Sequence, residues 1–277
     1  MIIVYILAAI LIFGVLIAVH EFGHFAAAKL CGVRVNEFSI GMGPLIWHKE
    51  TAETQYSLRL LPIGGFCAME GEDEESGDER SLGRQGFFKK AVIFAAGSFM
   101  NFLAGFLIIL AVYSGAAGFL IPAAAGTAPE FEQQNGQTLQ AGDIFYEISG
   151  ERVYLYSDVS LLMSLHQGQP MDLVVLRDGE KVELNDITWG TYTGTEGETY
   201  QGYGIYIAGD QVEEANLWTL LKTSWLNTID FVRIVRLSLQ MLVTGQAGMD
   251  DLSGPVGIVS TITQVGTASE TFAAAVE

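Results

Sequence analysis

The stretch 18-AVHEFGHFAAAK-29 places two histidines and a glutamate directly after a run of uncharged residues. No residue from Met1 to Val19 carries a charge, and most are aliphatic. Such a run has the length that a helix needs to cross a bilayer. Because a helix rises about 1.5 Å per residue, His20 would lie about 27 Å along it, close to the far membrane face. The run therefore predicts a transmembrane helix over residues 1–30, with its most polar cluster at membrane depth.

A cleaved secretory signal is the competing interpretation of this run. Such a signal has a basic start, a shorter apolar core and a cleavage site of small residues. Here no lysine or arginine precedes Lys29, and apolar residues continue beyond the polar cluster. The pattern therefore favours a span that is retained.

The polar cluster itself, His20-Glu21-Phe22-Gly23-His24, has the spacing H-E-x-x-H. Residues four apart lie on one face of a helix, so His20 and His24 can bind one ion. Zinc suits two neutral imidazole ligands, which predicts a Zn²⁺ site. Glu21 can take a proton from an activated water and pass it to a leaving amine. Without a metal these ionisable groups would stand in hydrocarbon, where they are costly.

The composition agrees with a membrane protein that has one water-facing part. The 277 residues are 50% hydrophobic, yet the formal net charge is −18. The two properties are segregated along the chain, since a second uncharged run extends from Ala91 to Ala128. We therefore expect a second transmembrane helix over residues 91–121.

Small and polar residues recur at spacings of three to four along this second run, at Gly97, Ser98, Asn101 and Gly105. This spacing is typical of close packing against another membrane helix. Asn101 has a second interpretation, a hydrogen bond to substrate backbone or to a catalytic group. Both interpretations remain open from the sequence.

The distribution of basic residues predicts the topology. Eight of the 14 lysines and arginines fall within residues 29–90, and three fall within residues 121–214, beside sixteen acidic residues. The positive-inside rule then places residues 29–90 in the cytoplasm and residues 121–214 outside. We expect a multi-pass protein of the cell membrane. Its acidic external domain argues against nucleic acid as a partner.

Three further segments complete the expected organisation. Glycine-broken, alternating residues over 31–90 predict a β-hairpin region and an acidic linker, either dipping into the bilayer or forming a small sheet at its surface. Strand signals around one helix over 122–214 predict an external α+β domain. The segment 215–277 begins with charged residues among aromatic ones, which favours an amphipathic helix in the membrane interface over a third span.

Several short motifs follow one another in a familiar order: AVHEFGH, FSIGMGP, LPIGGFCAMEGED, GSFMNF, LQAGDIFYEISGERV and LSGPVGI. Together they resemble the site-2 protease family of intramembrane zinc metalloproteases, in its bacterial PDZ-containing branch. The resemblance implies Zn²⁺ held by His20 and His24, with Glu21 as general base. It also implies a PDZ-like external domain. The segment 61–70 then resembles the family's membrane-associated β-hairpin, which holds the substrate in extended form, and Gly64 and Gly65 are its candidate substrate-binding residues.

The implied activity is hydrolysis of peptide bonds within the membrane. The implied substrates are single-span proteins already cut by another protease, such as anti-sigma factors or signal-peptide remnants. The family takes a third zinc ligand from an L-D-G motif on a later transmembrane helix, and no L-D-G occurs in these 277 residues. We therefore expect a C-terminally truncated sequence. The alternative is a catalytically incomplete, membrane-anchored PDZ adaptor.

The expected fold class is a membrane α-helical core with two transmembrane helices, its third core helix missing. A β-rich cytoplasmic insertion and an external α+β PDZ-like domain accompany this core.

Overall fold

The computed structural model describes residues 2–74, 76–194, 197–245, 257 and 261. The chain divides into two units, of which Met1–Gly105 makes up most of the first and Phe106–Leu237 forms the second. Each unit is described by itself. The LSGPVGI segment, apart from Gly257, lies outside the described residues.

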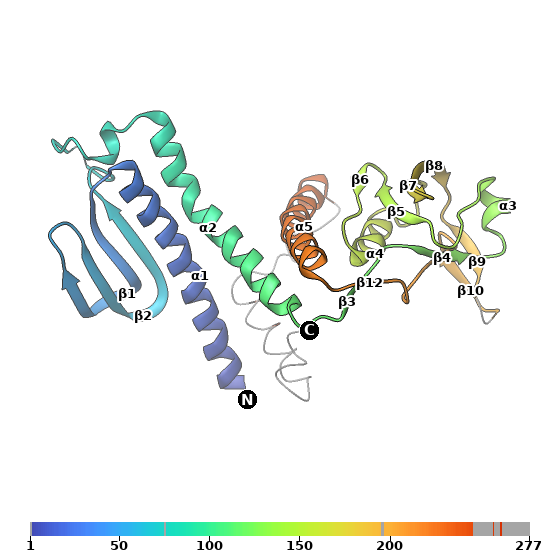
Figure 1. Ribbon diagram of the computed structural model, residues 1–277, viewed down its shortest axis with the longest axis horizontal. Helices are drawn as coiled ribbons and strands as arrows, with labels where there is room; N and C mark the ends of the chain where they lie inside the picture. Colours follow the sequence, from blue (N-terminus) through green and yellow to red (C-terminus); the bar gives the residue numbers. More distant parts are fainter. Residues whose placement is uncertain (1, 75, 195–196, 246–256, 258–260, 262–277) are drawn as a thin grey trace. The chain divides into compact units, whose positions relative to one another are not determined.

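The first unit consists of two long helices and a β-hairpin. Its elements are α1 (Ile2–Cys31), β1 (Val35–Glu50), β2 (Gln55–Met69), the 3₁₀ helix η1 (Leu82–Arg84) and α2 (Phe87–Tyr113), whose last turns belong to the second unit. In Figure 1, α1 lies between the hairpin and α2. This position lets α1 present different residues to each neighbour.

Within the described residues, two helices are long and apolar enough to cross a membrane, Ile3–Cys31 and Phe87–Tyr113. The helix expected over residues 1–30 is confirmed. The second helix begins at Phe87, four residues before the expected Ala91. Its first turn contains Lys89 and Lys90, whose ammonium groups bond to backbone carbonyls outside the apolar stretch. Lys89 Nζ donates to the Cys31 carbonyl at 2.8 Å, and Lys90 Nζ donates to the Gly83 carbonyl at 2.8 Å.

The expected end of the second span at residue 121 is wrong by eight residues. The helix α2 ends at Tyr113, and the chain then forms strand β3 (Gly118–Leu120). This strand pairs antiparallel with β12 (Val212–Glu214), so residues that are apolar enough for a span form a sheet ladder instead.

Two glycines let α1 approach its neighbours closely. A Cβ added at Gly14 would overlap the Pro62 carbonyl of β2, and one added at Gly23 would overlap the Ala96 carbonyl of α2. Small residues at such points allow helix backbones to come near each other, which is how helices pack in membranes.

The strands β1 and β2 form a two-stranded antiparallel sheet with several register irregularities. The β-hairpin region expected within residues 31–90 is confirmed, since β1 and β2 both lie there and pair with each other. The narrower segment 61–70 is not a hairpin by itself, because residues 61–69 form the second half of β2 and their partner strand is β1.

Arg59 of β2 bonds to three groups of β1 in the irregular part of this hairpin. Arg59 donates to the Glu37 carboxylate at 2.8 Å, to Ser39 Oγ at 3.1 Å and to the Gly43 carbonyl at 3.0 Å. The hairpin also exposes many large apolar side chains: Ile40, Met42, Leu45, Ile46, Trp47, Leu58, Leu60, Leu61 and Ile63. Exposed apolar surface of this extent is typical of a binding or membrane-contacting face.

The second unit is an α+β domain with one helix attached to it. After β3 its elements are β4 (Ala124–Thr127), α3 (Phe131–Asn135), β5 (Ile144–Ile148), β6 (Glu151–Arg152), α4 (Tyr156–Leu165), β7 (Met171–Arg177), β8 (Glu180–Ile187), β9 (Gly190–Thr193), β10 (Thr199–Gly202), β11 (Ile205–Ile207), β12 and α5 (Leu217–Thr244). A four-stranded sheet has the order β6-β5-β7-β8, and the other strands pair as β3–β12, β4–β11 and β9–β10.

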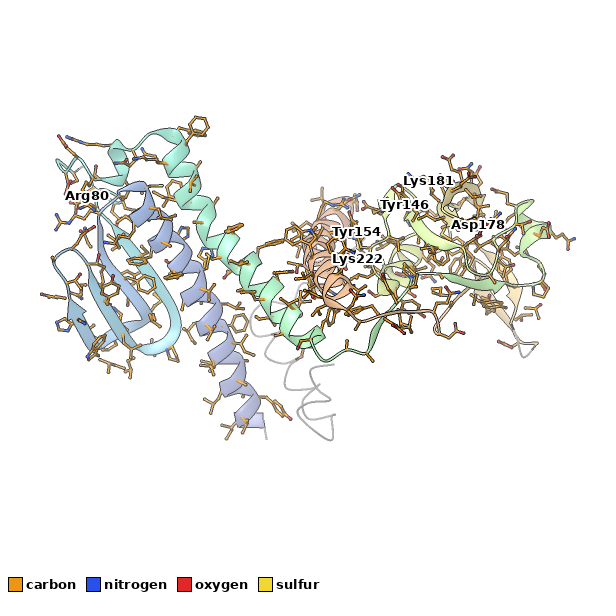
Figure 2. All side chains as sticks on the ribbon, in the orientation of Figure 1. Arg80, Tyr146, Tyr154, Asp178, Lys181 and Lys222 are labelled. Carbon is orange, nitrogen blue, oxygen red and sulfur yellow. The ribbon has the colours of Figure 1, made fainter. Side chains whose placement is uncertain are left out.

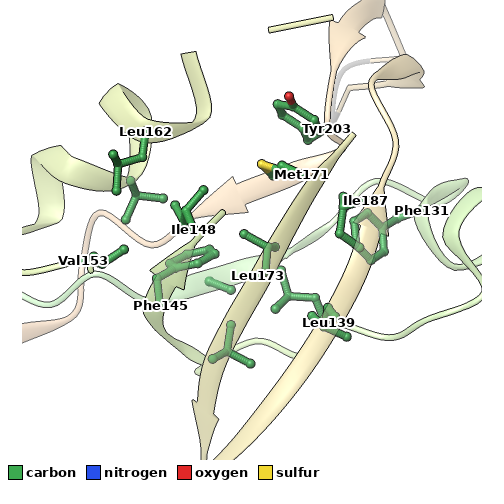
Figure 3. Packing of buried hydrophobic residues seen from close by; sticks show 14 of the residues in the cluster. Phe131, Leu139, Phe145, Ile148, Val153, Leu162, Met171, Leu173, Ile187 and Tyr203 are labelled. Carbon is green, nitrogen blue, oxygen red and sulfur yellow. The ribbon is translucent and has the colours of Figure 1, made fainter. Parts of the chain in front are cut away.

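The core of this domain lies between the four-stranded sheet and α4. Figure 3 shows Phe145 and Ile148 of β5, Leu173 of β7 and Leu162 of α4 packed together, and all four are buried. The α+β class expected over residues 122–214 is confirmed. The domain begins slightly earlier, at β3, and its PDZ-like character stays a prediction.

Cationic side chains stack on one tyrosine of β5. The Arg152 guanidinium lies 3.2 Å from the centre of the Tyr146 ring, and Lys181 Nζ lies 4.0 Å from it. Tyr146 and Lys181 lie close together in Figure 2. Such stacking keeps two of the domain's few basic residues on an otherwise acidic surface.

The helix α5 contacts the domain through charged residues. Arg233 is 7% exposed, and its Nη2 atom lies 2.8 Å from Asp158 Oδ1. The same guanidinium bonds to the carboxylate of Asp230 on its own helix and to the carbonyl of Arg152. One buried cation therefore lies between two buried carboxylates.

Asp158 has a second role at the start of α4. Its Oδ2 atom accepts the backbone N–H groups of Tyr154 and Leu155 at 2.7 and 2.9 Å. The carboxylate thus joins the first turn of α4 to α5, and the Tyr154 ring lies 5.1 Å from the Arg233 guanidinium.

The apolar side chains of α5 point away from its buried polar residues. Those exposed are Leu217, Trp218, Leu221, Trp225, Phe231, Val232, Val235, Leu239 and Val243. The helix is amphipathic, as expected, and it is not among the candidate spans of the described residues. Its place in the membrane interface stays a prediction.

We predict opposite effects for the two carboxylates around Arg233. Burial raises the pKa of Asp230, and the charge of Asp158 raises it further. A raised folded-state pKa means that the charged form opposes folding. This penalty is absent below the ordinary pKa of 3.8 and grows as the pH rises through the folded-state pKa. At pH 7, Asp230→Asn should therefore leave stability unchanged or increase it.

Asp158→Asn is the matched comparison. It removes the carboxylate charge with which the α+β domain contacts Arg233 of α5. It should destabilise the second unit by about 1.5–3 kcal/mol, the range for a hydrogen bond to a charged group. Thermal unfolding of the detergent-solubilised protein, followed at pH 7 and pH 4, measures both. Equal losses for the two variants at pH 7 would contradict this account.

Candidate active site

The two histidines of the H-E-x-x-H motif lie on successive turns of α1, with their rings in contact. The Nε2 atoms of His20 and His24 are 3.1 Å apart. Two nitrogens bound to one tetrahedral zinc at 2.0–2.1 Å are about 3.3 Å apart. The pair therefore fits a shared zinc ion without rearrangement of α1.

The ring of His24 is oriented by the neighbouring helix α2. Its Nδ1–H donates to the carbonyl of Ile93 at 2.7 Å, and Ile93 is fully buried. Since Nδ1 carries the hydrogen, the lone pair of Nε2 is free for a metal.

Asn101 of α2 lies beside the other histidine. Its Nδ2 atom is 3.4 Å from Nδ1 of His20. Of the two interpretations that the sequence left open, the structure supports a contact with His20, a candidate metal ligand. No periodicity connects residues 81 positions apart, so only the folded arrangement of α1 and α2 reveals this contact.

Gly97 of α2 faces the two metal-binding nitrogens. A Cβ added there would lie 2.5 Å from Nε2 of His24 and 2.6 Å from Nε2 of His20. Only a glycine leaves room beside both atoms. The sequence indicated helix packing at this position, and the structure adds that the packing is against the candidate metal ligands.

Glu21 lies beside strand β2. A Cβ added at Gly65 would lie 3.4 Å from Cγ of Glu21 and 2.8 Å from the carbonyl of Ser39. The structure thus brings Gly65 to the candidate base. Gly64 has a φ of +99°, a conformation that favours glycine, and packs against Met42.

An apolar cavity of about 450 Å³ lies between α1 and the hairpin. Its lining includes Ala18 and Val19, which directly precede the H-E-x-x-H motif, and Phe22, which belongs to it. Further wall residues are Leu11, Gly14, Val15, Phe38, Ile40, Gly41, Leu58, Arg59, Pro62 and Met100. A cavity of this size and character accommodates several apolar side chains.

Cys67 lies two residues beyond Gly65 on β2 and is buried. Burial raises the pKa of its thiol to about 12, and the charge of Glu21 adds to this effect. Among the described residues, no group of three or more histidine, cysteine, aspartate or glutamate side chains is placed to hold a metal. The described part of the chain therefore offers two strong ligands, both on α1.

Comparison with known proteins gives a consistent result. The model of Peptidase family M50 matches residues 8–276. A protein of Clostridium perfringens that is named as a zinc metalloprotease is 35% identical over 92% of this chain and 74% of its own length. A similarly named protein of Clostridium acetobutylicum is 33% identical over 92% of this chain and 73% of its own length. The Regulator of sigma-W protease RasP of Bacillus subtilis is 25% identical over 94% of this chain and 80% of its own length.

The chain belongs to Peptidase family M50, so the predicted relationship to site-2 proteases is confirmed. It is a zinc metalloprotease by family. Zn²⁺ is the cofactor given in the names of its relatives, and the two neighbouring imidazoles are suitable ligands for this ion. Two candidate membrane helices agree with the membrane location of such a protease.

We predict that Gly97→Ala abolishes tight zinc binding. The added methyl group would occupy the space beside both Nε2 atoms, where the ion has to lie. Gly105→Ala is the matched control on the same helix, because a Cβ added at Gly105 would meet no atom within 4 Å. Zinc content of the purified variants, measured by atomic emission, tests this. Equal zinc content in both variants would show that the ion does not lie between the histidines and Gly97.

Proposed function

We propose that this protein cleaves transmembrane segments of single-span membrane proteins that another protease has already shortened. His20 and His24 hold the zinc ion, and Glu21 is the general base. The observation that supports this most directly is the 3.1 Å separation of the two Nε2 atoms within a candidate span. A hydrolytic site at that depth meets peptide bonds that are inside the bilayer.

Bound zinc supplies Lewis acidity, which polarises the scissile carbonyl and makes a water molecule more acidic. Glu21 takes the proton from the attacking water and then delivers it to the leaving amine. The side chain is half-buried beside β2, and Gly65 lets the strand backbone pass close to it. Water is thus excluded from one side of the base by the strand itself.

The hairpin supports the proposed mode of substrate binding. Each strand of the two-stranded sheet has one edge that no other strand covers in the described part of the chain. A substrate segment in extended form can add to such an edge through backbone hydrogen bonds. Gly64 and Gly65 would allow it to approach Glu21, and the apolar cavity would receive its side chains.

The external part supports a membrane-surface location for the second unit. We propose that the domain is PDZ-like and that the apolar side of α5 lies in the membrane interface. Trp225 stacks on Phe106, and Asn227 Nδ2 donates to the Tyr113 hydroxyl at 2.8 Å, so α5 contacts the last turns of α2. Since α2 is a candidate span, these contacts with its last turns support a position of α5 near the membrane surface.

The proposed substrates include anti-sigma factors and signal-peptide remnants, both of which present a short apolar span after a first cut. The name of RasP, a regulator of sigma-W, supports the first class. The lipid bilayer is the second partner, and the formal net charge of −18 argues against nucleic acid.

We predict that Glu21→Gln retains zinc and loses proteolysis. Glutamine keeps the size of the side chain but cannot accept the proton, a loss that typically costs on the order of 10²- to 10⁴-fold in rate. Cleavage of a transmembrane reporter by the complete protein in proteoliposomes measures this. Glu50→Gln, at the exposed end of β1, is the matched control.

Cleavage by Glu21→Gln at the parental rate would remove Glu21 from the mechanism. If the parent itself binds the reporter but never cleaves it, the adaptor alternative is favoured.

We predict that residues 29–90 face the cytoplasm and that the α+β domain lies outside. In a background without Cys31 and Cys67, a cysteine at the exposed Glu180 should react with an impermeant thiol reagent in intact cells. A cysteine at the exposed Glu74 should react only after the membrane is opened. Labelling of Glu74→Cys alone in intact cells would invert the topology.

A further inference from the structure

The contact between Asn101 and His20 contains a mismatch of hydrogen-bonding groups. The amide nitrogen of Asn101 faces Nδ1 of His20 at 3.4 Å. The amide oxygen Oδ1 is buried, and it has no hydrogen-bond partner among the described residues. Buried polar atoms are nearly always bonded, so this oxygen requires an explanation.

Zinc binding would also place a second donor in this contact. A neutral imidazole carries one hydrogen, so a histidine that offers Nε2 to a metal carries that hydrogen on Nδ1. In that form His20 Nδ1–H and the Asn101 amide would be two donors facing each other. The nitrogen and oxygen of a carboxamide exchange places by rotation, and their assignment follows from the hydrogen bonds around them.

Rotation of the Asn101 amide removes the conflict between the two donors. The oxygen then lies where the nitrogen was and accepts the hydrogen of His20 Nδ1, while the amide nitrogen takes the position that the oxygen held. Nε2 of His20 is left with its lone pair toward Nε2 of His24.

We propose that Asn101 is a positioning residue for the metal site, whose Oδ1 atom accepts the Nδ1–H group of His20. The proposal rests on the proposed function, in which His20 and His24 hold zinc. Metal-bound histidines usually donate their second nitrogen to a carbonyl or carboxylate oxygen, and an amide oxygen can serve in the same way.

The geometry of α2 supports this role. The carbonyl of Ile93 orients His24, Gly97 leaves room beside both histidines, and Asn101 contacts His20. These three positions are four residues apart, so they lie along one face of α2. One helix therefore supplies an acceptor for each histidine and the space between them.

The test compares two substitutions of Asn101 in the purified chain. Asn101→Asp keeps an acceptor oxygen, whereas Asn101→Leu has a similar size and none. Zinc affinity is measured in detergent by competition with a chromogenic chelator. We expect Asn101→Leu to weaken binding by about 10- to 100-fold, and Asn101→Asp to bind as tightly as the parent or more tightly.

Two controls separate positioning from folding. Ser98→Ala, at an exposed position of the same helix, should leave the affinity unchanged. Asn101→Ala removes the acceptor without adding apolar bulk, so it should weaken binding even if the leucine variant misfolds. ¹⁵N NMR of labelled histidine in the zinc-loaded protein reports the tautomer directly, and the His20 Nδ1–H form should persist in the aspartate variant.

Unchanged zinc affinity in both Asn101→Leu and Asn101→Ala would overturn the proposal, as would an aspartate variant that binds as weakly as they do. A parent that binds zinc no better than His20→Ala would refute the zinc site itself. That result is distinct from a failure of Asn101 alone, in which the parent still binds zinc tightly.

Discussion

The close approach of α1 and α2 is the constraint on which the rest of the site depends. Two imidazoles on one helix can face a common ion, but a single helix cannot orient both rings. The second helix has to come near enough for its own backbone and an amide to reach them. Gly23 and Gly97 allow this approach, because any side chain at either position would overlap atoms of the other helix. Within the membrane, small residues and polar contacts of this kind hold helices together.

The helix α1 presents its candidate metal ligands to one neighbour and its candidate base to another. Its histidines face the continuous helix α2, whereas Glu21 faces Gly65 of β2. The hairpin is irregular, and Arg59 bridges its strands at the irregular part. The metal-binding side thus has a fixed geometry, and the side that would meet a substrate has backbone that another strand can join.

How well the sequence predicts each part of this arrangement depends on how far apart the interacting residues are along the chain. The spans, the H-E-x-x-H motif and the α+β class depend on neighbours within a few residues, and they were predictable. The roles of Gly97 and Asn101 depend on contacts with His20 and His24, which lie far earlier in the chain and which no local pattern connects to α2. The hairpin was predictable because glycines interrupt both of its strands, but its irregular register depends on how the two strands pair. For α5 the amphipathic pattern was evident, but nothing in it indicated that the polar side would be buried.

That burial gives the joint between α5 and the α+β domain an unusual chemical character. Detergents and lipids compete for apolar surfaces, and they have little affinity for a guanidinium enclosed by two carboxylates. Salt screens exposed charges but reaches buried ones poorly. The joint at Arg233 should therefore resist both detergents and changes of ionic strength. The apolar side of α5 could therefore meet lipid or detergent while its polar side stays attached to the domain.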